Sequence, residues 1–132
     1  MTWEKARAQA APIRETVFVA EQGVPAEIEM DEMDAPCVHA LAFGGARAVG
    51  TGRLLPDGHI GRMAVLKEFR GKGVGGALLA KLMEAAKSRG DREVLLSAQV
   101  HAVPFYQSYG FEPFGEVYEE AGIPHRDMRR AF

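Results

Sequence analysis

A loop rich in glycine and positive charge near the middle of the chain is the segment best suited to chemistry. It lies between an apolar run, 60–65, and an amphipathic pattern, 74–89. Its residues are Arg70, Gly71, Lys72, Gly73, Val74, Gly75 and Gly76. Glycines let a ligand approach the backbone closely, and free N–H groups at the start of a helix attract anions. The loop therefore predicts a site for a diphosphate-bearing cofactor.

Two familiar nucleotide loops fit this segment less well. The loop lacks the Lys-Ser/Thr ending of a nucleoside-triphosphate P-loop. Gly71, Gly73 and Gly76 satisfy the G-x-G-x-x-G pattern of dinucleotide sites. That pattern forms a tight turn directly after its strand, whereas residues 66–69 intervene here. The remainder of the chain after Gly76 is also too short for a doubly wound sheet with a substrate domain.

A third possibility is coenzyme A. The R-x-x-G-x-G arrangement of residues 70–75, at a strand–loop–helix junction, resembles the R/Q-x-x-G-x-G/A signature of the GNAT-type N-acetyltransferase family. The preceding run, 60–65, is similar to the fourth strand of that family, and 102–111 is similar to its A-x-x-F-Y-x-x-x-G-F segment. Segments 14–25 and 122–125 resemble a subgroup of small bacterial members with poorly defined substrates.

The resemblance implies an enzyme and its reaction. Such an enzyme transfers acetyl from acetyl-CoA to an amine of a small molecule or a protein, by direct attack through a tetrahedral intermediate. An alternative from another class is a catalytically silent acyl-CoA-binding module that senses the cofactor. Tyr106, at the family's F-Y position, favours the enzyme because a sensor needs no acid.

The glycine loop is expected to hold the diphosphate of the cofactor. Main-chain N–H groups of 71–75 are the expected donors, and Arg70 is expected to contribute mainly through the loop backbone. Lys72 either supports the phosphates or is simply solvated.

The strand before the loop is expected to receive the pantetheine arm. Met63, Ala64 and Val65 should splay from the neighbouring strand, 93–98, and open their backbone groups to the ligand. The resemblance assigns the thioester oxygen to the N–H of Val65. Gln99 stands where many family members carry Asn, and its amide can still bond the pantetheine arm.

Tyr106 is the expected general acid, which protonates the leaving CoA thiolate. The alternative is a half-buried tyrosine that only packs. Phe105, Tyr109 and Phe111, which surround it in the chain, are assigned to the core.

The general base is left open. The candidates are Glu21, Glu29, Asp31, Glu119 and His125. Glu21 follows a helix end that lies near the acceptor in this family, and imidazole such as that of His125 titrates near neutral pH. Asp31 and Asp34 belong to an acidic stretch that either attracts a cationic acceptor or forms a solvated loop.

The sequence predicts a series of helices and strands that carry these candidate site residues. Apolar spacing predicts a helix over 3–19, which Pro12 interrupts and divides. The remaining elements are strands 37–43, 46–55, 60–65 and 93–98, helices 74–89 and 103–109, and a strand pair, 114–118 and 125–130. The expected fold is α/β, a mixed and mostly antiparallel sheet with one parallel βαβ crossover and helices on both faces, as in GNAT acyl-CoA N-acyltransferases. The family's first strand is expected to be very short or absent.

Length and composition limit the remaining possibilities. The 132 residues suggest one domain, 1–132, and the net charge of −2 argues against nucleic acid or an anionic membrane as the partner. No apolar run is long enough to span a membrane and none resembles a signal segment, which favours a cytoplasmic location.

Cys37 is expected to be a buried thiol. No zinc or calcium spacing occurs, so no metal is expected. A missing first strand would expose a sheet edge and favour a homodimer.

Overall fold

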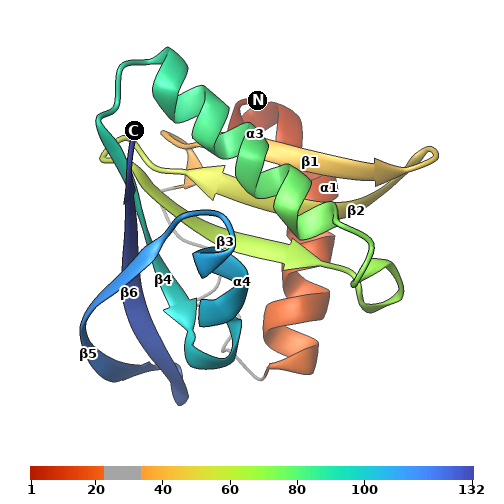
Figure 1. Cartoon of the computed structure of the whole chain (residues 1–132). Helices are drawn as coiled ribbons and strands as arrows, with labels where there is room; N and C mark the ends of the chain where they lie inside the picture. The colour runs from red at the N-terminus through yellow and green to blue at the C-terminus, as the bar shows by residue number, and fades with distance from the viewer. Residues whose placement is uncertain (23–33) are drawn as a thin grey trace.

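One six-stranded sheet organises the molecule, and the computed structural model describes residues 1–22 and 34–132 (Figure 1). The elements are α1 (Trp3–Arg14), η1 (Glu15–Glu21), β1 (Val38–Gly44), β2 (Arg47–Leu54), β3 (His59–Val65), η3 (Lys67–Phe69), α3 (Val74–Ser88), β4 (Glu93–Gln99), η4 (Val100–Ala102), α4 (Val103–Gln107), β5 (Glu112–Glu120) and β6 (Ile123–Ala131). The predicted fold class is confirmed.

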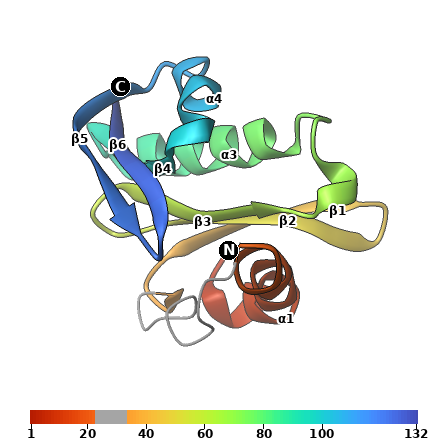
Figure 2. The same cartoon turned by 90° about the horizontal axis from the view of Figure 1, so that it is seen from below.

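The strand order is β1-β2-β3-β4-β6-β5. Neighbouring strands are antiparallel except β3 and β4, which α3 connects as a parallel crossover. Figure 2 shows α1 on one face of the sheet, with α3 and α4 on the other. The sheet therefore separates two layers of helix.

Each layer buries its own apolar cluster. Beneath α3 the cluster includes Leu79, Leu82 and Met128, each almost fully buried. Beneath α1 a smaller cluster contains Ile13, Val17, Val49, Ala64 and Leu66. Alternation along β3 directs Ala64 to the α1 side and Val65 to the α3 side. A short stretch of β3 thus contributes to both layers.

The N-terminal helix differs from the prediction at Pro12. This residue lies inside α1, and the chain continues through Glu21 as the π-helical η1. Proline removes one helical N–H and crowds the preceding turn. Burial of Ile13 and Val17 on the α1 side keeps the helical path in spite of that loss. The predicted division into two shorter helices is therefore wrong.

The two parallel strands separate soon after they pair, as predicted. In the described part of the chain, β3 pairs with β4 only at His59 and Ile60. The β2–β3 register then shifts, and Arg62 adopts a φ of 49°. A bulge of this kind bends its strand. The arrows of β3 and β4 consequently point apart in Figure 1.

At the other side of the sheet, β1 is an edge strand. No strand precedes α1 among the described residues, but Met1 makes one strand-like pairing with this edge. The Met1 amine donates to the His39 carbonyl at 2.5 Å, and the His39 N–H donates to the Met1 carbonyl at 2.7 Å. Cys37, just before β1, is buried as predicted. The homodimer suggested by this edge stays a prediction.

Candidate active site

The open edge of β3 presents the backbone of Val65. The N–H of Leu66 donates to the carbonyl of Val49 at 2.9 Å, so these two residues form a hydrogen-bonded pair of the β2–β3 ladder. Hydrogen-bonded and non-bonded pairs alternate along an antiparallel ladder. Val65, opposite Gly50, therefore directs its N–H and C=O away from β2. Both groups face the gap where β4 has separated.

The side chain of Arg70 lies across this open edge. Its Nε donates to the Val65 carbonyl at 3.0 Å, and its Nη2 donates to Oε2 of Glu21 at 2.8 Å. The Arg70 side chain is thus engaged within the protein, and its contribution to cofactor binding through the loop backbone stays a prediction. The guanidinium joins the end of η1 to the end of β3, and Glu21 enters the site as its partner.

Two glycines of the loop have backbone conformations that favour glycine. Gly71 and Gly73 have φ of 77° and 83°, and a Cβ added at either would meet nothing within 4 Å. Gly73 is the N-cap of α3, and no side chain caps that helix start. The first turn of α3 thus offers N–H groups next to open space, as an anion site requires.

Gly76 has a different role. It is buried, and a Cβ there would overlap the hydroxyl oxygen of Tyr109. Its missing side chain makes room for that tyrosine, so packing accounts for this glycine without a ligand.

Lys72 is exposed, with its ammonium 5.5 Å from the centroid of the Phe69 ring.

Tyr106 lies on α4, on the α3 side of the sheet (Figure 2). Its ring packs edge-on against Phe105 and Phe111, at centroid distances of 5.1 and 6.0 Å. Burial raises the pKa of the Tyr106 phenol above its ordinary value of 10. The hydroxyl therefore keeps its proton at neutral pH, as a general acid must.

The aromatic neighbours of Tyr106 are only partly in the core. Phe111 is 2% exposed, as predicted, and Tyr109 is half-buried. Phe105 is 39% exposed, so its assignment to the core is wrong. Its ring would contact a Cβ at Gly75 at 3.6 Å, which places it over the start of α3.

Gln99 connects the end of β4 to the end of η1. Its Nε2 donates to Oε1 of Gln22 at 2.9 Å, and its Oε1 lies 2.7 Å from Nε2 of His101. His125 is the β6 residue directly opposite Gln99. Nδ1 of His125 lies 2.7 Å from the Ile123 carbonyl, which can only accept. Nδ1 therefore carries the proton, and Nε2 of the neutral ring has the free lone pair.

The structure separates the candidate bases. Glu21 accepts from Arg70, and His125 lies beside Gln99. Glu119 pairs with Pro124 and so alternates to the face opposite His125. Glu29 and Asp31 lie outside the described residues.

Asp34 belongs neither to a solvated loop nor to an acceptor-attracting surface. It is 2% exposed, and its carboxylate accepts from Arg14 at 2.8 Å and from Arg53 at 2.9 Å. Nε2 of His39 lies 2.8 Å from its carbonyl. Sequence reasoning missed this buried cluster. The signal was Arg14, which follows Ala10 by four residues on the buried stripe of α1.

Two further observations concern other kinds of site. Within residues 1–22 and 34–132, no group of three or more His, Cys, Asp or Glu side chains could hold a metal ion. In the same residues, no helix has both the length and the apolar character of a membrane span.

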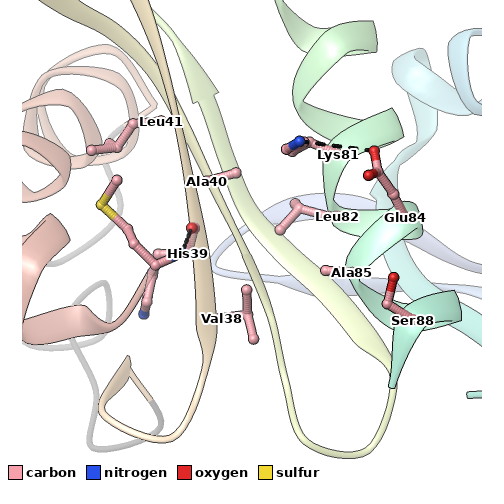
Figure 3. A pocket seen from close by; sticks show the side chains of 10 residues that line it. Val38, His39, Ala40, Leu41, Lys81, Leu82, Glu84, Ala85 and Ser88 are labelled. Atoms are coloured by element: carbon pink, nitrogen blue, oxygen red, sulfur yellow. Dashed lines mark hydrogen bonds and ion pairs between the residues drawn. The ribbon is translucent and has the colours of Figure 1, made fainter. Parts of the chain in front are cut away.

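A hollow of 350 Å³ lies between β1 and α3, and its lining includes Val38, Ala40, Lys81, Leu82, Glu84 and Ala85 (Figure 3). It lies along the later turns of α3, beyond the glycine loop.

Comparison with known proteins is consistent with this geometry. A family model described as an acetyltransferase (GNAT) domain matches residues 5–132. An uncharacterised N-acetyltransferase of Bacillus subtilis, YjcF, is 42% identical over 122 residues, which cover 89% of this chain and 87% of that protein. Protein ElaA of Escherichia coli is 39% identical over 126 residues, with 89% and 82% covered. The crystal structure of an acyl-CoA N-acyltransferase from Pseudomonas aeruginosa has a TM-score of 0.84 and 36% identity, covering 97% of this chain and 91% of that one.

Proposed function

Because the chain belongs to the GNAT acetyltransferase family and is an acyltransferase that uses acetyl-CoA, we propose that the cofactor lies in the gap between β3 and β4. The observation that supports this placement is the early separation of these strands beside the glycine loop. The N–H groups of residues 71–75 hold the diphosphate. The pantetheine arm runs along the backbone of Met63, Ala64 and Val65, and Gln99 faces it from β4.

The reaction we propose is direct acetyl transfer to an amine of a small molecule or a protein. The neutral amine attacks the thioester carbon, a C–N bond forms, and the carbonyl oxygen becomes an oxyanion. The N–H of Val65 donates to that oxygen, a contact worth about 2.7–4 kcal/mol of barrier in other enzymes. The C–S bond then breaks, and the thiolate takes the proton of Tyr106.

The amine must also lose a proton. His125 is the proposed base, because its Nε2 has a free lone pair when Nδ1 donates to the Ile123 carbonyl. Glu21 acts instead as the partner of Arg70, since its carboxylate already accepts from that guanidinium.

Calorimetric titration with acetyl-CoA, with NADH as the comparison ligand, tests the site. Gly73→Ala and Gly90→Ala form a matched pair, because φ is 83° and 92° at these positions and neither Cβ would meet an atom within 4 Å. Both variants carry the same backbone strain, about 1–2 kcal/mol. Only Gly73→Ala is expected to weaken acetyl-CoA binding. Binding of NADH by the wild type would contradict the placement of the cofactor at the glycine loop. An equal loss of acetyl-CoA affinity in both variants would contradict it as well.

A further inference from the structure

Two consecutive residues at the end of η1 contact both strands that border the catalytic gap. Glu21 accepts from Nη2 of Arg70 at 2.8 Å, and Arg70 also donates to the carbonyl of Val65, the last residue of β3. Oε1 of Gln22 accepts from Nε2 of Gln99, the last residue of β4, at 2.9 Å. Glu21 and Gln22, which we call the strap, therefore span the gap where the two strands separate.

The helical geometry of η1 brings the strap to this position. The Gln22 N–H donates to the carbonyl of Val17, five residues earlier, at 3.2 Å. Val17 is held in the apolar cluster beneath α1. In Figure 1 the end of this helix, in orange, lies between the diverging arrows of β3 and β4. Single π-helical turns are found frequently at functional sites, and this one ends at the gap.

The strap lies on the α1 side of the sheet. Ala98 is buried in the cluster beneath α3, so alternation along β4 directs the Gln99 side chain to the opposite face. Figure 2 shows α1, which η1 continues, on the face opposite α3 and α4. The contact between the two amides of Gln22 and Gln99 is therefore made on the α1 side.

The proposed position of the cofactor directs its acyl chain toward the strap. The diphosphate lies at the start of α3, and Tyr106, on the α3 side, faces the leaving sulfur. The N–H of Val65 on β3 binds the oxygen. Sulfur, oxygen and the acyl chain lie in one plane around the thioester carbon, so the chain takes the remaining direction, toward α1 and β4. The amine attacks from above or below this plane, and the strap leaves that approach open.

We propose that the strap determines the acyl specificity of the enzyme, because Gln22 stands where the carbon atoms beyond acetyl would extend. This inference rests on the proposed function. Displacement of the strap by a longer acyl chain would break a hydrogen bond to each side of the gap. Enzyme pockets distinguish ligands that differ by one methylene about ten- to 200-fold. The strap thus favours acetyl over longer acyl groups.

Calorimetric titration with acetyl-CoA, propionyl-CoA and butyryl-CoA tests the inference without an acceptor. The three ligands differ only in the acyl chain, so the ratios of their dissociation constants report the space beyond the thioester. Wild type is expected to bind butyryl-CoA at least about tenfold more weakly than acetyl-CoA. Gln22→Ala removes the amide that contacts Gln99 and should reduce this difference about tenfold. Gln22→Glu keeps the side-chain length and an oxygen that accepts from Gln99, so it should retain the difference.

Controls separate this inference from the function on which it rests. Gln9→Ala, which removes an exposed glutamine side chain from α1, should leave the wild-type ratios unchanged. Gln22→Asn, shorter by one methylene, gives the same test if Gln22→Ala does not fold. Failure of the wild type to bind acetyl-CoA would overturn the proposed function itself. Equal binding of acetyl-CoA and butyryl-CoA by the wild type, unchanged ratios in the shortened Gln22 variants, or the same change in Gln9→Ala would overturn the inference alone.

Discussion

Glu21 and Arg70, 49 residues apart in the chain, are joined by a hydrogen-bonded ion pair of 2.8 Å. The same guanidinium donates to the carbonyl of Val65. One side chain therefore links the end of the N-terminal helix to the strand whose backbone is proposed to bind the thioester. The Glu21–Arg70 pair therefore contacts the Val65 peptide directly through its carbonyl.

Replacement of Arg70 by Lys should impair catalysis more than stability. A single ammonium lacks the planar fork that reaches both Glu21 and Val65. Small displacements of positioning groups have large kinetic effects, so kcat should fall about tenfold or more. The pair is partly exposed, 43% at Arg70 and 32% at Glu21, so the free energy of unfolding should change by less than about 1 kcal/mol. Steady-state kinetics and urea denaturation measure the two effects, and an unchanged kcat would remove Arg70 from the site.

Glu21→Gln distinguishes a positioning residue from a base. If Glu21 orients Arg70, the variant should lower kcat without changing the shape of the pH–rate profile. Combined with Arg70→Lys, it should add little further loss, because both changes break the same link. A profile that loses its acidic limb in Glu21→Gln would instead identify Glu21 as the base.

Tyr106→Phe should abolish most turnover and leave acetyl-CoA affinity nearly unchanged. General acid catalysis contributes about a hundredfold or more, and the ring that packs on Phe105 and Phe111 is retained. Because burial raises the pKa of Tyr106 above 10, the acid stays protonated up to that pH, and the alkaline fall of wild-type activity should come only at higher pH. The variant should lack this alkaline fall. Full activity in Tyr106→Phe would show that another group protonates the thiolate.

The parts that the sequence predicts well are those with local causes. The strand expected over 46–55 is β2, Arg47–Leu54, because glycine turns at Gly45 and Gly58 bound it on either side. The glycine loop is equally local, since φ at Gly71 and Gly73 follows from the turn itself.

The parts that the sequence did not predict depend on distant contacts. Asp34 lies in an acidic stretch whose pattern suggests solvent, yet Arg14, 20 residues away, makes it a buried ion pair. Nothing near Arg70 in the chain indicates that Glu21 would engage its side chain. Phe105 has the large apolar side chain of a typical core residue. The short α4 instead places it beside the start of α3, where it is partly exposed.

Asp34→Asn should strongly destabilise the protein. Removal of one partner from a buried ion pair costs about 3–5 kcal/mol, and Asp34 accepts from two buried guanidinium groups. Asp91→Asn is the matched control, because Asp91 pairs with Arg89 at the surface, where such pairs contribute less than about 1 kcal/mol. Urea denaturation of both variants compares the losses. Equal, small losses would show that the buried cluster contributes little to folding.

His39 should make stability depend on pH. Burial lowers the pKa of His39 below its ordinary value of 6.5, and this effect exceeds the opposing influence of the Asp34 carbonyl and charge. The unfolded chain therefore binds a proton near pH 6.5 that the folded protein does not, so the free energy of unfolding should fall as the pH drops below 6.5. His39→Gln, whose amide can still donate to the Asp34 carbonyl, should reduce this fall. Thermal unfolding at several pH values between 5 and 8 measures both proteins, and parallel curves would exclude His39 as the titrating group.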